Sequence, residues 1–212
     1  MIEVKICGVN SAAALAAAAA AGADFAGFVF FPPSPRAVTP AEAAAISAAH
    51  PGGPARVGLF VDPSDEALAA TLAALPLDLI QLHGAETPAR VAAVRARFGV
   101  PVMKAIGIGA AADLALIPAY AAVSDRLLLD AKPAPDAALP GGNAHPFEWG
   151  LLTGAAIGRP WLLAGGLTPA NVAQAIRAAG APGVDVSSGV ERARGVKDPA
   201  LIREFVAAAR RG

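Results

Sequence analysis

The stretch WLLAGGLTPANVAQAIRAAGAPGVDVS, residues 161–187, contains one complete strand–helix–strand unit. Short apolar runs at Trp161–Ala164 and Val184–Ser187 have the length of buried strands. The alanine-rich run between them, Thr168–Ala179, has the length of a helix. Because two apolar strands joined through a helix are typical of a parallel sheet, this stretch predicts an α/β fold.

The same alternation of strands and helices covers the rest of the chain. Further strands are expected at Ile2–Cys7, Phe25–Phe31, Arg56–Val61, Leu77–His83, Val100–Gly107 and Arg126–Asp130. Further helices are expected at Ser11–Gly22, after Thr39, and at Ser64–Ala74, Thr87–Phe98, Ala110–Ala122, Pro146–Ala156 and Pro199–Arg211. Ser11 is a suitable N-cap, and Glu42 stands three residues after Thr39, which is the spacing of a capping box.

Eight strand–helix units in 212 residues predict a closed (β/α)8 TIM barrel, with eight parallel strands inside a layer of helices. No linker rich in Pro, Gly and Ser divides the chain, so we expect residues 1–212 to form a single domain. An open doubly wound sheet is the alternative. Such a sheet would carry a glycine-rich turn after its first strand, and residues 7–10 read CGVN instead.

Composition narrows the class of protein. The chain has 17 basic and 17 acidic residues and is 55% hydrophobic, which excludes a disordered protein and disfavours a nucleic-acid partner. The uncharged stretch Val9–Ala23 is mostly alanine and shorter than a membrane span. The first residues lack the order of a signal peptide, and the lone cysteine suits a reducing compartment. We therefore expect a soluble, cytoplasmic protein without membrane contact.

Alternation within the strands predicts which polar side chains face the barrel interior. Lys5 and Cys7 alternate with apolar residues in the first strand, Gln81 and His83 in the fourth, and Asp185 in the eighth. Barrel enzymes place their chemistry at the carboxyl ends of the strands. The sequence therefore predicts an active site at that rim.

Cys7 and Asp130 are candidates for proton transfer because each ends a strand. Lys5, two residues before Cys7, would favour the thiolate, and acid–base work calls for a pKa of Cys7 below its ordinary value. A cysteine that only fills space in the core is the alternative for Cys7. An aspartate that only caps a loop is the alternative for Asp130.

Glycines and serines after the last strands predict a phosphate site. Barrels often bind phosphate with the loops after strands seven and eight, and glycine lets backbone N–H groups come close to the anion. Those loops contain Gly165, Gly166, Ser187, Ser188 and Gly189, and Gly142 after the sixth strand would add a third loop. The alternative is that they are only turn glycines.

Together, the segments at the strand ends resemble the phosphoribosylanthranilate isomerase family of tryptophan biosynthesis, from residue 5 to about residue 205. The segments are Lys5-Ile6-Cys7-Gly8, Ser34-Pro35-Arg36, Gln81-Leu82-His83-Gly84, Leu129-Asp130, Pro140-Gly141-Gly142, Leu163-Ala164-Gly165-Gly166-Leu167, Asn171-Val172, Asp185-Val186-Ser187-Ser188-Gly189-Val190-Glu191 and Gly195-Val196-Lys197-Asp198. The family more often continues the sixth loop as Gly-Gly-Thr-Gly, whereas this chain has Asn143-Ala144 after its glycine pair. This departure puts in question how that loop closes over a substrate.

The resemblance implies an enzyme that rearranges N-(5-phosphoribosyl)anthranilate into 1-(2-carboxyphenylamino)-1-deoxyribulose 5-phosphate. It implies Cys7 as general base, Asp130 as general acid and Arg36 on the anthranilate carboxylate. His83, Gln81 and Lys5 are expected to contribute to substrate binding. No cofactor is expected. The partner is then a small-molecule substrate, and both a monomer and a homodimer agree with the sequence.

Three other functions are the alternatives. The related isomerase of histidine biosynthesis would use aspartates at both catalytic strand ends, and Cys7 stands at one of them. A sugar-phosphate epimerase would need metal-binding histidines on several strands, whereas His50, His83 and His145 are scattered, so no metal is expected. A non-catalytic phosphate-binding barrel would lack an acid or a base.

Overall fold

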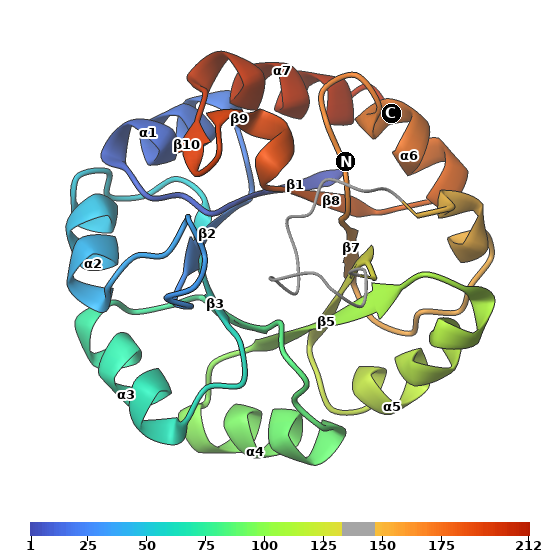
Figure 1. The fold of residues 1–212 in the computed structure, drawn as a ribbon, viewed down its shortest axis with the longest axis horizontal. Helices are drawn as coiled ribbons and strands as arrows, with labels where there is room; N and C mark the ends of the chain where they lie inside the picture. The colour runs from blue at the N-terminus through green and yellow to red at the C-terminus, as the bar shows by residue number, and fades with distance from the viewer. Residues whose placement is uncertain (133–146) are drawn as a thin grey trace.

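In the computed structural model, which describes residues 1–132 and 147–212, eight parallel strands close into a barrel in chain order. The strands are β1 Glu3–Cys7, β2 Phe25–Val29, β3 Ala55–Phe60, β4 Leu79–Leu82, β5 Val102–Ile108, β6 Arg126–Ala131, β7 Trp161–Leu163 and β8 Gly183–Val186. Figure 1 shows them as an inner ring surrounded by helices. This confirms the predicted (β/α)8 barrel.

Seven α-helices lie outside the strands in the described part of the chain. They are α1 Ala12–Ala21, α2 Pro40–Ala48, α3 Asp65–Ala74, α4 Pro88–Phe98, α5 Ile117–Ala121, α6 Val172–Ala179 and α7 Pro199–Ala209. Ser11 accepts a hydrogen bond from Ala14 N, and Thr39 and Glu42 form a reciprocal capping box, so both predicted helix starts are confirmed. None of these helices has the length and the apolar composition that crossing a membrane requires.

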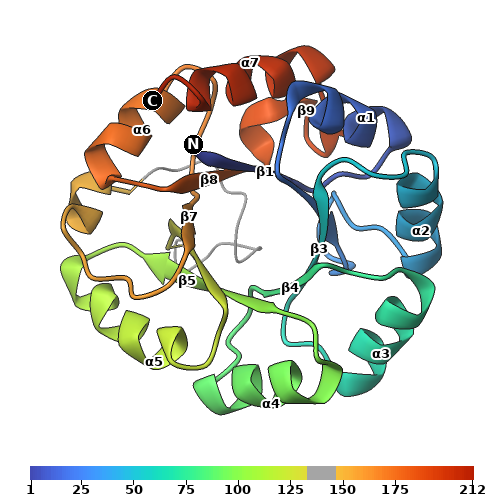
Figure 2. The ribbon, with the colours of Figure 1, turned by 180° about the vertical axis from the view of Figure 1, so that it is seen from behind.

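The barrel closes where the first strand meets the last. β1 pairs in parallel with β8, and Lys5 stands opposite Asp185 in that pairing. Seen from behind in Figure 2, α1 and α7 lie side by side over this seam, and the two helices pack against each other. Residues from both ends of the chain therefore meet at one point of the barrel wall.

Two predicted helices differ from the structure. The segment expected as Ala110–Ala122 is a 3-10 helix, η1 Ala111–Leu116, followed by the short α5. Of the helix expected at Pro146–Ala156, the described part is a single 3-10 turn, η2 Trp149–Leu152. Gly154 follows with a φ of 73°, a left-handed conformation that stops a helix. Pro146 lies outside the described residues.

A short antiparallel hairpin follows the last barrel strand and was not predicted. After the 3-10 helix η3 Ser188–Val190, the strands β9 Glu191–Ala193 and β10 Val196–Lys197 pair with each other. The hairpin lies at the barrel mouth near α1 and α7 (Figure 1).

The predicted alternation of side chains is observed. One face of each strand packs into a large apolar cluster beneath the helices, which includes Val4 and Ile6 of β1. The other face fills the interior with a second cluster, made of Val57, Leu79, Met103, Ala105, Leu128, Leu162 and Ala164. Buried polar side chains share this inner face at Lys5, Gln81 and Asp185. The interior is thus a packed core that includes polar side chains from β1, β4 and β8, and Asp130 of β6 is buried as well.

Candidate active site

A buried ion pair joins β1 and β8 inside the barrel. Lys5 Nζ donates a hydrogen bond to Asp185 Oδ1 at 2.7 Å, and the Lys5 side chain has no exposed surface. Burial lowers the pKa of Lys5, but the charge and hydrogen bond of Asp185 outweigh it and place the pKa above its ordinary value. Lys5 is therefore a fixed positive charge.

The Cys7 thiol lies beside this charge at the end of β1. A Cβ atom on Gly27 of β2 would stand 3.2 Å from both Cys7 Sγ and Lys5 Nζ. The ends of both side chains therefore lie next to the backbone of Gly27. Burial raises the pKa of Cys7, and the Lys5 charge offsets this only in part. The expectation of a lowered Cys7 pKa is therefore wrong for the unliganded protein.

Asp130, the residue before the last of β6, belongs to a chain of polar contacts that begins on β4. Its Oδ1 accepts a hydrogen bond from Ala131 N at 2.8 Å, and its Oδ2 lies 3.2 Å from His83 Nε2. His83 Nδ1 in turn lies 2.9 Å from Gln81 Nε2. The other amide atom, Gln81 Oε1, is buried without a hydrogen-bond partner among the described residues. The structure therefore brings Gln81, His83 and Asp130 together.

Arg36 lies at the rim after β2 and is buried rather than solvated. A Cβ atom on Gly8 would stand 2.6 Å from Arg36 Cδ, so the arginine stem crosses the residue that follows Cys7. Its Nε and Nη2 donate to the two carboxylate oxygens of Glu191 at 2.7 and 3.0 Å. The guanidinium is thus held in place by a second side chain, that of Glu191.

The end of β6 and the loops after β7 and β8 pack against one another at the same rim. A Cβ atom on Gly165, whose φ is 91°, would stand 2.7 Å from Ala131 N. A Cβ atom on Gly189 would stand 1.9 Å from Leu167 O, so no larger residue fits there. Gly166 also has a positive φ of 64°. Close approach of other backbone atoms therefore requires glycine at 165 and 189, and the positive φ favours glycine at 166.

Ser187 and Ser188 stand between β8 and Gly189 in this group of loops. The predicted phosphate residue Gly142, and the Asn143-Ala144 pair after it, lie outside the described residues.

Sequence reasoning missed two residues that shape this site. Gly27 stands alone inside an apolar strand, and a lone glycine in a strand signals close approach of another group. Glu191 ends the serine–glycine segment after β8 but was not assigned a role. The first signal was available in the sequence, whereas the second needed the contact with Arg36.

Histidines do not form a metal site in the described part of the chain. No three His, Cys, Asp or Glu side chains converge there. The His83 ring faces Gln81 and Asp130, and the His50 carbonyl accepts from Arg56 Nη2. His145 lies outside the described residues.

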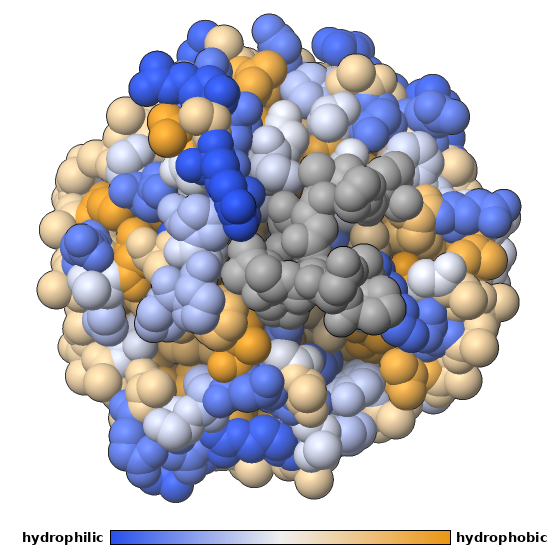
Figure 3. Space-filling model, viewed as in Figure 1, coloured by the Kyte–Doolittle hydropathy of each residue, from blue (hydrophilic) through white to orange (hydrophobic). Residues whose placement is uncertain are grey.

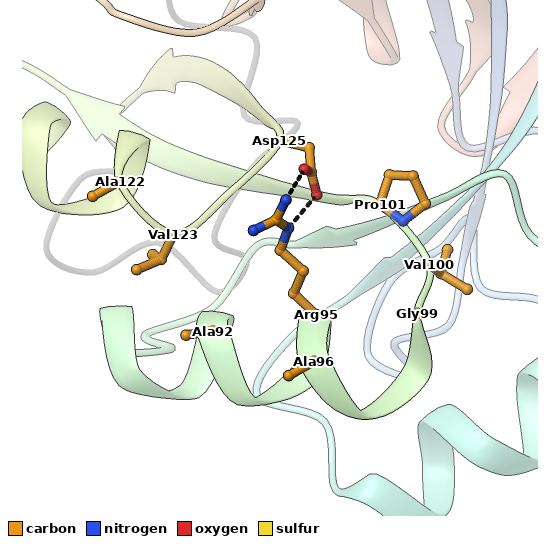
Figure 4. A pocket seen from close by; sticks show the side chains of 9 residues that line it. All are labelled: Ala92, Arg95, Ala96, Gly99, Val100, Pro101, Ala122, Val123 and Asp125. Carbon is orange, nitrogen blue, oxygen red and sulfur yellow. Dashed lines mark hydrogen bonds and ion pairs between the residues drawn. The ribbon is translucent and has the colours of Figure 1, made fainter.

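A cavity lies at the opposite end of the barrel. The residues that line it belong to the segments that precede β5 and β6. Its volume is about 530 Å³, and Arg95 and Asp125 pair within it through two contacts of 2.7 and 2.9 Å (Figure 4). These two charges neutralise each other. The candidate active site is therefore taken as the polar rim at the carboxyl ends of the strands, where Cys7, Arg36 and Asp130 lie.

Comparison with known proteins gives the family. The family model described as N-(5'phosphoribosyl)anthranilate (PRA) isomerase matches residues 4–208. The N-(5'-phosphoribosyl)anthranilate isomerase of Paracoccus denitrificans (strain Pd 1222) is 63% identical over 208 residues, covering 98% of this chain and 97% of that protein. A phosphoribosyl anthranilate isomerase structure from Thermotoga maritima has a TM-score of 0.89 and 34% identity, with 100% of both chains covered.

Another similar structure is of a phosphoribosyl anthranilate isomerase in complex with reduced 1-(o-carboxyphenylamino)-1-deoxyribulose 5-phosphate. It has a TM-score of 0.87 and 33% identity, and it too covers 100% of both chains. The fold, the family match and the sequence identity over nearly the whole chain all point to one family. The chain belongs to the N-(5'-phosphoribosyl)anthranilate isomerase family.

Proposed function

We propose that this protein catalyses the Amadori rearrangement of N-(5'-phosphoribosyl)anthranilate to 1-(o-carboxyphenylamino)-1-deoxyribulose 5-phosphate, a step of tryptophan biosynthesis, in the cytoplasm. The observation that carries the mechanism is a pair of buried groups at one rim. Cys7 lies beside Lys5 at the end of β1, and Asp130 lies beside His83 at the end of β6. One group can accept a proton and the other can donate one.

Asp130 acts first, as the general acid. It donates its proton to the furanose ring oxygen while the bond between that oxygen and C1' breaks. The nitrogen lone pair forms the C1'=N bond, which leaves a positively charged Schiff base. Ala131 N and His83 fix the two carboxyl oxygens, so the acid is held in one orientation. A positioned acid contributes about 10²–10⁴-fold in rate.

Cys7 then acts as the general base. It removes the proton from C2', and the electron pair forms the C1'=C2' bond while the C=N electrons return to nitrogen. The resulting enolamine becomes the aminoketose when C1' gains a proton and the C2' hydroxyl loses one. The Schiff-base cation favours the thiolate, so it lowers the pKa that burial raises in the free enzyme. The base is therefore activated only after the acid has acted.

Arg36 and the glycine loops bind the two ends of the substrate. Arg36 pairs with the anthranilate carboxylate from its place beside Gly8. The backbone N–H groups of Gly165, Gly166 and the 187–189 segment bind the phosphate, because glycine allows such close approach. Gly142 belongs to this phosphate site by the family resemblance.

The oligomeric state is open to both a monomer and a homodimer. The Thermotoga maritima isomerase is described as dimeric and has also been crystallised as monomers generated from it. Sedimentation of the purified protein will assign its own state as monomer or homodimer.

The test is direct turnover. Purified protein is mixed with freshly prepared N-(5'-phosphoribosyl)anthranilate, and the carboxyphenylamino product is separated and quantified. We expect product to form in proportion to enzyme. The aminoaldose of histidine biosynthesis serves as the control substrate and should be left unchanged. Well-folded protein that forms no product would refute the proposal.

A further inference from the structure

The β9–β10 hairpin carries one buried carboxylate among exposed neighbours. The Glu191 side chain is 4% exposed, whereas residues 192–194 are exposed. In Figure 3, strongly hydrophilic residues gather over this hairpin at the barrel mouth. Glu191 therefore points inward, where its charge needs partners.

The partners of Glu191 are two cations and a backbone N–H. Its Oε1 accepts from Arg36 Nε at 2.7 Å and from Lys197 Nζ at 2.7 Å. Its Oε2 accepts from Arg36 Nη2 and from Gly195 N, both at 3.0 Å. Burial alone would raise the pKa of Glu191, but Arg36, Lys197 and Gly195 hold it at about 2, so the carboxylate stays ionised.

This cluster has an excess of positive charge. Arg36 and Lys197 are both buried and share one carboxylate, and neither forms an ion pair with another acid among the described residues. Two buried cations against one anion leave one positive charge uncompensated. A buried uncompensated charge is costly, so this arrangement favours the binding of an anion.

Glu191 also decides which edge of Arg36 is free. A guanidinium offers its N–H groups along fixed edges, and each edge can hold one carboxylate through two parallel bonds. Glu191 occupies the edge formed by Nε and Nη2. Arg36 Nη1 has no hydrogen-bond partner in the described part of the chain, so the edge that includes it is left for a ligand carboxylate.

The hairpin connects Arg36 with the loop after β8. Lys197 Nζ donates to Ser187 O at 2.9 Å as well as to Glu191. A Cβ atom on Gly195 would stand 2.6 Å from Pro35 O, next to Arg36. One carboxylate thus joins the group proposed to bind the substrate carboxylate to a loop proposed to bind its phosphate.

We propose that Glu191 is a positioning residue of this isomerase. It aims the free edge of Arg36 at the substrate carboxylate and, through Lys197, fixes the distance from Arg36 to the phosphate loop. This inference rests on the proposed function, which assigns the two binding roles. It specifies a substrate that carries an anionic group at each end of a molecule of fixed length.

The main experiment compares KM and kcat of Glu191→Gln with those of the unaltered enzyme. The substitution keeps the shape of the side chain and removes the charge. We expect KM for phosphoribosylanthranilate to rise about tenfold or more and kcat to change less than about threefold, because ground-state and transition-state binding are lost together. Glu204→Gln on the exposed face of α7 is the matched control and should behave as the unaltered enzyme.

A double variant separates positioning from general damage. If Glu191 acts through Arg36, adding Glu191→Gln to Arg36→Ala should raise KM no further than about twofold above Arg36→Ala alone. A fully multiplicative effect of the two substitutions would overturn the proposal. So would an unchanged KM, or a fall in kcat as large as the rise in KM, in folded Glu191→Gln.

Glu191→Asp keeps the test decisive if Glu191→Gln does not fold. The aspartate side chain is shorter but retains the charge. The KM of Glu191→Asp should therefore lie between those of the unaltered enzyme and of Glu191→Gln, and at least about threefold above that of the unaltered enzyme. A KM equal to that of the unaltered enzyme would overturn the positioning role. Absence of turnover in the unaltered enzyme would instead refute the proposed function, so the two failures are distinguishable.

Discussion

His83 Nε2 lies 3.2 Å from Asp130 Oδ2, which joins the ends of β4 and β6 across the intervening strand β5. A neutral imidazole has one N–H and one acceptor nitrogen. Because Gln81 Nε2 donates to His83 Nδ1, the ring proton lies on Nε2 and faces the Asp130 carboxylate. The histidine thus contacts one oxygen of the proposed acid and anchors it.

Replacing His83 with alanine should therefore slow the reaction without abolishing substrate binding. The Asp130 carboxyl group would lose one of its two anchors, and misplacement of a catalytic group costs on the order of 10²-fold in rate. We expect kcat to fall by about 10- to 100-fold and KM to change less than about threefold. Steady-state kinetics at saturating substrate measures both. A normal kcat would show that Ala131 N alone orients the acid.

Cys7→Ala and Asp130→Ala should each lower kcat by about 10²–10⁴-fold, because each variant lacks one of the two proton-transfer groups. Substrate should still bind, since Arg36 and the phosphate loops are unaltered. Turnover is measured alongside equilibrium binding of the reduced product analogue. Near-normal kcat in either variant would remove that residue from the mechanism.

Gly27→Ala should damage the site where Cys7 and Lys5 meet. The new Cβ would stand 3.2 Å from Cys7 Sγ and from Lys5 Nζ, which is too close without displacement of both. We expect a loss of about 1–3 kcal/mol in the free energy of unfolding, together with a lower kcat.

Gly150→Ala is the control for this substitution, since a Cβ there meets no atom within 4 Å. Its effect should stay within about 0.5 kcal/mol. Denaturant titration measures both proteins. Equal stability of the two variants would contradict the packing that we describe around Gly27.

The contribution of Glu191 to the free energy of unfolding should decrease as the pH is lowered. Its pKa is about 2 in the folded protein and starts from an ordinary value of 4.5. A depressed folded pKa gives stability that is present above about pH 4.5 and is lost as the pH falls toward about 2. The unaltered protein should therefore lose its advantage over Glu191→Gln across this range.

Urea titrations of both proteins at pH 7, 4 and 3 measure this difference. The glutamine variant serves as the reference because all other carboxylates are shared. A difference in the free energy of unfolding that stays constant from pH 7 to pH 3 would contradict the ionised cluster.

Local pattern was sufficient for the strands and for the direction of their side chains. Period-two alternation placed Lys5, Gln81 and Asp185 on the inner face, and the structure buries all three there. Cap chemistry placed the starts of α1 and α2. These features depend on neighbouring residues, so a single sequence contains them.

Contacts between distant loops could not be predicted in the same way. Arg36 and Glu191 are 155 residues apart, and no local pattern states which loops meet at the rim. The raised pKa of Cys7 could not be predicted from the sequence for a related reason. Its sequence neighbour Lys5 was visible, whereas the burial that outweighs that charge results from packing of the whole barrel.

Lys5 and Asp185 are 180 residues apart in the sequence, so their contact can form only late in the synthesis of the chain. During synthesis the lysine and the neighbouring thiol are made at the start, and the carboxylate that neutralises the lysine comes with the last barrel strand. Any shorter nascent chain leaves that ammonium without its partner, which opposes its burial. Formation of a competent site and closure of the barrel are therefore the same event.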